Sequence, residues 1–280
     1  MTTAEFEAWL LDSERRPLVM GVLNVTPDSF SDGGRFDAVG AAVDHAEAMI
    51  ASGVDLIDIG GESTKPGAAR VPAGEQIARI TPVLDACRDL STTFSIDTTL
   101  TSVAAASLDR GVKVVNDVSA GRDDPAMFAL VADRRCPIVL MHLLGQPATM
   151  QDDPRYDNVV AEVRAFLSER ARAFEAAGVA RHRILVDPGI GFGKTLEHNL
   201  DLMRHLEQFA ADGRPVLVGV SRKGFIGRLT GKADANDRLF GTAAAVSAAI
   251  LRGASIVRVH DVSEMKDVVS VAAALRRRRV

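Results

Sequence analysis

Polar and ionisable residues recur in this sequence directly after short apolar runs. In chain order they are Asn24, Glu62, Asp97, Asn116 with Asp117, His142, Asp187, Ser221 to Lys223, and Arg258 with His260. The residues that precede the same runs form no comparable set. The carboxyl ends of parallel strands meet at one edge of a sheet or barrel, so these side chains are expected to share one site.

Three of these residues, Asp97, Asn116 and Asp187, indicate recognition of a flat heterocycle. Carboxylates only accept hydrogen bonds, whereas a primary amide both donates and accepts. Such a set, with Lys223, suits a ring with adjacent N–H donors, such as a 2-amino-4-oxo-pyrimidine. Each residue alone could instead cap the following helix. A divalent metal site is the other alternative for paired carboxylates. Asn116 and Lys223 accompany the two carboxylates, and this combination favours recognition of an organic ligand over binding of a metal.

Arg258 and His260 indicate a binding site for an anion. They alternate along one strand and so point the same way. In a closed barrel Asn24, on the first strand, is their neighbour, and fixed donors there would stabilise charge on a phosphate leaving group. A histidine with a purely structural role is the alternative.

The stretch "DPGIGFGKT" (187–195) looks like a phosphate loop but does not match one. Only three residues separate Gly189 from Gly193, whereas the Walker A pattern needs four before its Gly-Lys-Ser/Thr. Asp187, a carboxylate, also leads the loop. The pattern therefore leaves open which ligand this loop holds.

Apolar strand-like runs alternate with Ala-rich helix-like segments along the whole chain. The strands are expected at 18–25, 54–60, 93–97, 112–117, 137–142, 183–189, 215–221 and 255–260. The helices are expected at 38–52, 73–90, 100–110, 124–134, 156–177, 195–212, 236–252 and 262–276. Several of these end at a glycine suited to a left-handed cap. Eight alternations over this length favour a (β/α)8 TIM barrel over a doubly wound sheet.

The composition and net charge of the chain argue against several classes of protein. The 280 residues are 47% hydrophobic and carry a net charge of −4, so no basic field attracts nucleic acid. No run is long enough for a membrane helix, and no signal peptide is evident. We expect a cytoplasmic protein with an N-terminal extension at 1–17, as an extra helix or lid below the barrel, and one barrel domain at 18–280. Cys87 and Cys136 are expected to be reduced.

Several motifs together resemble the dihydropteroate synthase family. They are "GVLNVTPDSFSDGG", "DIGGESTKPGA", "SIDT", "VNDVS", "VLMH", "DPGIGFGKT", "GVSRKGFIG" and "VRVHDV", in order between about residues 18 and 275. The resemblance implies a pterin-binding TIM barrel that joins 6-hydroxymethyl-7,8-dihydropterin diphosphate to 4-aminobenzoate. Diphosphate and 7,8-dihydropteroate would be the products, with Mg2+ assisting.

The resemblance also assigns roles to residues. Asp97, Asn116, Asp187 and Lys223 would hold the pterin, and the loop 187–195 would then hold this ring rather than a phosphate. Asp97, Lys223 and Arg258 would take part in catalysis. The pterin pocket would be lined by Met141, Phe192 and Gly219; the Mg2+-diphosphate site would use Asn24, Arg258 and His260; and the aminobenzoate pocket would use Phe30, Thr64, Lys65, Pro66, Ser221 and Arg222.

One position departs from the family pattern, because Lys65 stands where an arginine is usual. Lysine keeps the charge but lacks the planar guanidinium, so altered handling of the substrates is expected. A catalytically silent pterin-binding paralogue and a pterin-dependent methyltransferase that feeds a corrinoid remain the alternatives. The loops 26–36 and 61–72 are expected to be lids. A homodimer through the last three helices is implied by the family, although 242–252 could simply pack on the barrel.

Overall fold

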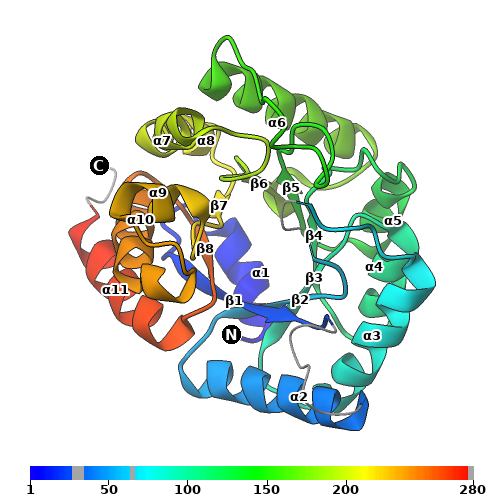
Figure 1. The fold of residues 1–280 in the computed structure, drawn as a ribbon. Helices are drawn as coiled ribbons and strands as arrows, with labels where there is room; N and C mark the ends of the chain where they lie inside the picture. The colour runs from blue at the N-terminus through cyan, green and yellow to red at the C-terminus, as the bar shows by residue number, and fades with distance from the viewer. Residues whose placement is uncertain (27–34, 64–66, 277–280) are drawn as a thin grey trace.

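Eight parallel strands form a nearly closed barrel surrounded by helices, as predicted (Figure 1). The computed structural model describes residues 1–26, 35–63 and 67–276. The strands are β1 (Leu18–Asn24), β2 (Leu56–Gly60), β3 (Thr93–Asp97), β4 (Val114–Asp117), β5 (Ile138–Met141), β6 (Ile184–Asp187), β7 (Leu217–Val218) and β8 (Ile256–Val259). They pair in the order β6-β5-β4-β3-β2-β1-β8-β7, and a single bridge between Val186 and Val216 joins the two ends.

The expected helices follow the strands on the outside of the barrel. They are α2 (Arg35–Ala51), α3 (Ala73–Ala86), α4 (Thr101–Leu108), α5 (Met127–Arg134), α6 (Val159–Ala176), α7 (Leu196–Arg204), α8 (Glu207–Ala210), α10 (Leu239–Leu251) and α11 (Val262–Leu275). The expected helix 195–212 is divided into α7 and α8. The break follows His205, whose backbone N–H and Nδ1 both contact the carbonyl oxygen of Asp201.

A short helix in the loop after β7 was not predicted. It is α9 (Gly224–Thr230), and its glycines have low helix propensity. Gly227 is needed because a Cβ there would overlap the carbonyl oxygen of Lys232 and the guanidinium of Arg238. This helix begins directly after Lys223 and so holds that residue at the mouth of the barrel.

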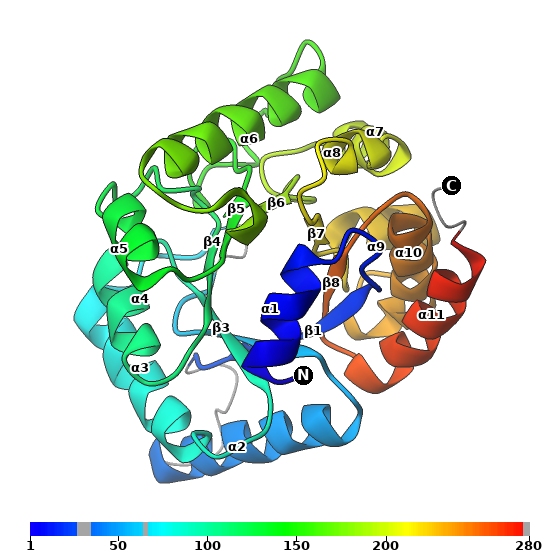
Figure 2. The same ribbon diagram turned by 180° about the vertical axis from the view of Figure 1, so that it is seen from behind.

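The first helix, α1 (Thr3–Leu11), closes the amino end of the barrel (Figure 2). Its buried Phe6, Trp9 and Leu10 pack on the apolar side chains that fill this end of the interior, among them Met20 and Leu56. The Trp9 indole N–H donates to the carbonyl oxygen of Arg16 at 2.8 Å, so the buried ring keeps its polar group satisfied. This helix lies within the segment 1–17, where an extra helix or lid was expected.

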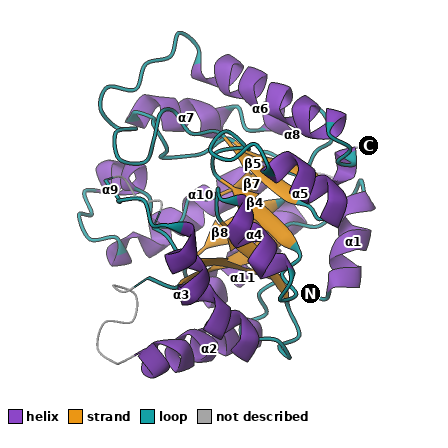
Figure 3. Ribbon diagram, turned by 90° about the vertical axis from the view of Figure 1, so that its right-hand side faces the viewer, coloured by secondary structure: helices purple, strands orange, loops and turns teal. Residues whose placement is uncertain are grey.

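The two ends of the barrel differ in character. Figure 3 shows α1 at one end and α9 with the loops that follow the strands at the other. The amino end of the interior is filled with apolar side chains and covered by α1, and the cavity inside the barrel lies at the carboxyl end. None of the described helices is long and apolar enough to cross a lipid bilayer.

Candidate functional site

A cavity of about 910 Å³ opens at the carboxyl end of the barrel. Its walls come from strand ends and from the loops that follow them, as expected for this fold. Every predicted site residue that the structure describes lines it: Asn24, Asp97, Asn116, Met141, Asp187, Phe192, Gly219, Ser221, Arg222, Lys223, Arg258 and His260. The remaining four, Phe30, Thr64, Lys65 and Pro66, lie outside the described residues.

One wall is built around the guanidinium of Arg258. Its Nε donates to Asp58 Oδ2 at 2.6 Å, and its Nη2 donates to Asp97 Oδ2 at 3.0 Å. Asn116, opposite Asp97 in the strand register, donates from Nδ2 to the same Asp58 oxygen at 3.0 Å. Arg258 thus balances carboxylates inside the barrel as well as facing the cavity. Sequence reasoning missed Asp58, although a carboxylate inside the apolar run "LIDIG" was the available signal.

The charges of this wall depend on one another. Burial raises the pKa of Asp97, and Arg258 opposes that rise. Burial alone would lower the pKa of Arg258, but Asp58 and Asp97 together hold it above its usual value. The guanidinium therefore stays charged, and its field favours the ionised form of Asp97.

The opposite wall carries Asp187, held by the turn that follows β6. The Gly189 N–H donates to Asp187 Oδ1 at 2.7 Å, and the His142 N–H donates to the Asp187 carbonyl oxygen at 3.0 Å. Gly189 has a φ of +69°, and a Cβ there would overlap the carbonyl oxygen of His142. Only glycine fits this turn. Burial raises the pKa of Asp187 to about 6, while the Gly189 N–H and Lys223 oppose it.

Two lysines approach the same cavity. Lys223 Nζ lies 4.0 Å from the centre of the Phe192 ring, a cation–π contact. Burial lowers the pKa of Lys223 to about 8, against the raising effect of Asp187. Lys194 Nζ lies 2.9 Å from the Phe192 carbonyl oxygen and 3.0 Å from His142 Nδ1. Burial lowers the pKa of Lys194 to about 7. Lys194, in "GFGKT", was not assigned to the site from the sequence.

Three of the polar residues that follow strands do not line the cavity: Glu62, Asp117 and His142. Successive side chains of a strand point to opposite sides, so Asn116 faces the interior and Asp117 faces the helices. Asp117 accepts from the backbone N–H groups of Ser119 and Gly121. Burial, followed by the charge of Lys194, lowers the pKa of His142 to about 3, so its ring is neutral.

The mouth of the cavity is lined by residues after β7 and β8. His260 Nδ1 lies 3.0 Å from Ser221 Oγ, and the His260 backbone N–H donates to the same oxygen at 3.2 Å. Arg222 has a φ of +59° and donates to Asp261 and to Asn236 Oδ1, which holds its side chain at the rim. Asn24, at the end of the adjacent β1, is partly exposed there.

Comparisons with known proteins agree with this geometry. A family model described as "Pterin binding enzyme" matches residues 20–260. The chain is 44% identical over 269 residues to the dihydropteroate synthase of a Synechocystis strain. The aligned region covers 96% of this chain and 93% of that protein.

Solved structures give the same result. A Xanthomonas albilineans dihydropteroate synthase solved with 4-aminobenzoic acid superposes with a TM-score of 0.88 at 46% identity, covering 94% of both chains. The X. albilineans enzyme in complex with 7,8-dihydropteroate gives a TM-score of 0.85 at 43% identity, covering 94% of this chain and 95% of that one. The chain belongs to the dihydropteroate synthase family. It is a transferase.

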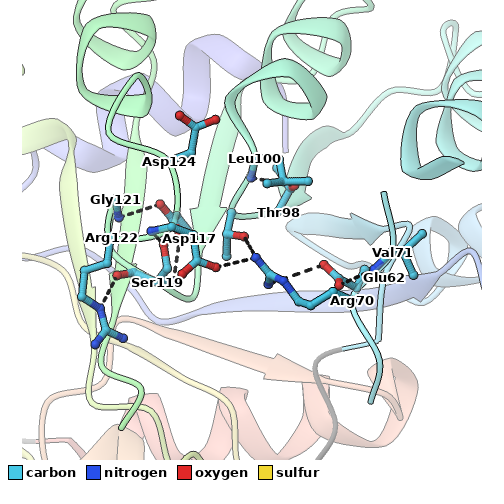
Figure 4. A network of polar contacts seen from close by, with 12 residues as sticks. Glu62, Arg70, Val71, Thr98, Leu100, Asp117, Ser119, Gly121, Arg122 and Asp124 are labelled. Carbon is cyan, nitrogen blue, oxygen red and sulfur yellow. Dashed lines mark hydrogen bonds and ion pairs between the residues drawn. The ribbon is translucent and has the colours of Figure 1, made fainter. Parts of the chain in front are cut away.

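A polar network outside the cavity holds the described ends of the loop that follows β2 (Figure 4). The buried Glu62 accepts from the Val71 N–H at 2.8 Å and from Gln76 Nε2 at 3.1 Å, so one carboxylate joins both stems of the loop. Arg70 donates to Asp123 Oδ2 at 2.6 Å and to Thr99 Oγ1 at 3.0 Å, and its Nη1 lies 3.8 Å from Glu62 Oε2. The loop stem after β2 is thereby attached to the loops after β3 and β4.

Replacing Arg70 by methionine is expected to loosen this stem. The change removes the contacts to Asp123 and Thr99 but leaves the Val71 bond to Glu62. Hydrogen exchange of the amides at 67–71 should become faster by about fivefold, since a hydrogen bond to a charged group contributes about 1.5–3 kcal/mol before solvent screening. Arg88→Met, which removes only an exposed pair with Asp85, is the control. Unchanged exchange in Arg70→Met would show that the network does not restrain the stem.

Proposed function

We propose that this chain condenses 6-hydroxymethyl-7,8-dihydropterin diphosphate with 4-aminobenzoate to give 7,8-dihydropteroate and diphosphate in folate biosynthesis. The observation that carries the proposal is the convergence of Asp97, Asn116, Asp187 and Lys223 on one cavity. Solved relatives with the same fold hold 4-aminobenzoic acid and 7,8-dihydropteroate.

The pterin would lie between the two carboxylate walls. Asp97 and Asp187 are acceptors only, which suits the N–H groups of a 2-amino-4-oxo-pyrimidine ring. Lys223 would donate to the ring carbonyl. The flat ring would contact Met141, Phe192 and Gly219, which line the same cavity.

The diphosphate would lie toward β8 and β1. Nε and Nη2 of Arg258 have protein partners, and among the described residues Nη1 has none, which suits it for a phosphate oxygen. His260 lines the cavity two residues further along the chain. Both would stabilise negative charge on the leaving group.

The residues present fit a Mg2+ ion that is shared with the substrate. The described residues contain no group of three His, Cys, Asp or Glu side chains able to hold a metal. Mg2+ commonly binds one or two side-chain oxygens, waters and substrate phosphates, and Asn24 supplies one amide oxygen in the cavity. When bound, the ion would neutralise charge on the diphosphate.

The aminobenzoate would bind at the outer part of the mouth. Ser221 and Arg222 line the cavity there, and Arg222 is fixed by Asp261. Phe30, Thr64, Lys65 and Pro66, the other residues proposed for this pocket, belong to segments outside the described residues. The effect of Lys65 in place of the usual arginine stays a prediction.

The reaction follows from these charges. The C–O bond between the pterin methylene and diphosphate breaks, and its electron pair leaves with the diphosphate, stabilised by Arg258 and His260. The cationic methylene is stabilised by the ring and by the negative charge of Asp97. The lone pair of the aminobenzoate nitrogen then forms the C–N bond, and its proton leaves to solvent. The amine needs no strong base, because its proton becomes acidic only after bonding.

The expected activity is release of diphosphate that depends on both substrates. A coupled assay of diphosphate should show turnover only when the pterin diphosphate and 4-aminobenzoate are both present. Asp97→Asn is expected to lower kcat by about 100-fold, as for loss of one electrostatic stabiliser. Pterin binding without aminobenzoate-dependent release would instead indicate a catalytically silent paralogue, and pterin-dependent methyl transfer would indicate the methyltransferase.

Binding of a pterin is expected to depend on pH on two sides. Asp97 and Asp187 must be ionised to accept N–H donors, and burial raises the pKa of Asp97 to about 7 and that of Asp187 to about 6. Affinity should therefore fall as the pH drops through about 7 and about 6, where these carboxylates gain protons. Lys223 must be protonated to donate, so affinity should also fall above about pH 8. Calorimetry with 6-hydroxymethylpterin measures the profile. Asp187→Asn should lose the step near pH 6 and keep the one near pH 7, and a parent affinity that is constant from pH 8 to pH 5 would contradict this assignment.

We also propose that the chain forms a homodimer through its last helices. Large apolar side chains are exposed on α10 and α11: Phe240 (82% exposed), Leu251, Val271 and Leu275. Exposed apolar side chains gathered on neighbouring helices mark association surfaces. The location of the protein in the cytoplasm stays a prediction from the sequence.

The substitution Phe240→Asp tests this surface. It places a charge where the partner would be packed, so the dimer should dissociate into monomers in analytical ultracentrifugation. Leu11→Asp, at a comparably exposed position on α1, should leave the oligomeric state unchanged. If both variants sediment as the parent does, the homodimer does not use α10.

A further inference from the structure

Asp58 is a buried carboxylate that the proposed mechanism does not use. It lies in the middle of β2, is 0% exposed and does not line the cavity. Leu56, two residues before it, belongs to the apolar cluster at the barrel floor. Asp58 therefore occupies the level between the floor and the ligand. An ionised group in such surroundings is retained only with strong partners.

The two partners of Asp58 are both residues of the cavity wall. Its Oδ2 accepts from Asn116 Nδ2 at 3.0 Å and from Arg258 Nε at 2.6 Å. An ionised carboxylate has no hydrogen to donate, so only the nitrogen of the Asn116 amide can face it. The amide oxygen of Asn116 must then face away from Asp58, toward the cavity that Asn116 lines.

We propose that Asp58 is a positioning residue that makes the pterin pocket accept hydrogen bonds. It turns Asn116 Oδ1 toward the ligand and holds Arg258 against Asp97. This inference rests on the proposed function, because the acceptors match a ligand whose ring carries successive N–H donors. With Asp97 and Asp187 the pocket then presents acceptors on both walls. If the Asn116 amide were turned by about 180°, its NH2 group would face the N–H donors of the ligand.

The substitution Asp58→Leu separates this role from simple packing. Leucine has a similar branched shape but offers no acceptor. Arg258 then keeps only Asp97, and the amide of Asn116 loses the partner that orients it. The Kd for 6-hydroxymethylpterin should rise by at least about tenfold, the effect of one unfavourable polar contact in a buried site.

The same variant should change the kinetic constants unequally. The KM for the pterin diphosphate is expected to rise with the Kd, whereas the KM for 4-aminobenzoate should change by less than about twofold, because Asn116 lies in the pterin part of the cavity. A merely structural loss would weaken both substrates alike.

Asp58→Asn gives the sharper test. Asn116 and Arg258 both donate to Asp58 Oδ2, so the oxygen of the new amide can take that position and accept from both. Asn116 then keeps its orientation, and pterin binding should be at least about tenfold tighter than in Asp58→Leu.

Asp55 provides the matched control. It is a second buried carboxylate just before β2, at the amino end of the barrel, and it bonds Arg16, the Val19 N–H and Lys266. Asp55→Leu should lower the melting temperature but leave pterin binding within about twofold of the parent, since none of its partners reaches the cavity.

The outcomes are distinct. Failure of the parent to release diphosphate with both substrates would overturn the proposed function, not the role of Asp58. If the parent binds pterin and Asp58→Leu binds it like Asp55→Leu, or Asp58→Asn binds no better than Asp58→Leu, the inference is wrong. Circular dichroism checks folding. Should Asp58→Leu not fold, Asp58→Ala takes its place in both comparisons.

Discussion

The site depends on one guanidinium shared between two carboxylates inside the barrel. Arg258 bonds Asp58 below the cavity and Asp97 at its wall, and all three side chains are largely withdrawn from water. Burial raises the pKa of Asp97, and the charge of Arg258 opposes that rise, so the guanidinium favours the ionised carboxylate, which only accepts hydrogen bonds. The arginine therefore helps a partly dry cavity to keep the acidic residues to which the proposed function assigns the N–H donors of the ligand.

The barrel places these groups by two simple features of strands. Alternation sends Asn116 inward while Asp117 points to the helices and organises the next loop. Parallel register brings Asp97 beside Asn116, and β8 brings Arg258 beside β1. Below them the apolar layer and α1 exclude water from the amino end. The polar groups can then interact only with one another and with what enters the mouth.

Much of the fold and of the rim could be predicted from the sequence. The eight apolar runs became the eight strands, because buried parallel strands and their intervening helices leave strong patterns. Asp97, Asn116 and Asp187 were found because they directly follow such runs. Asp58 was missed because a polar residue within an apolar run gives no sign of which partners it meets. The bond between Arg258 and Asp58 joins residues 200 positions apart, and such pairing depends on the closed barrel rather than on local sequence. Lys194 and α9 lie in loops, where glycine-rich sequences permit many conformations.

The most direct test of the account is a crystal structure of the protein soaked with 6-hydroxymethylpterin. We expect the ring to lie between Asp97 and Asp187, with its N–H groups donating to both carboxylates and to Asn116 Oδ1, while Arg258 stays bonded to Asp58. A ring bound outside this cavity, or an Asn116 amide whose nitrogen faces the ligand, would contradict the central claim that buried acceptors from separate strands read one pterin.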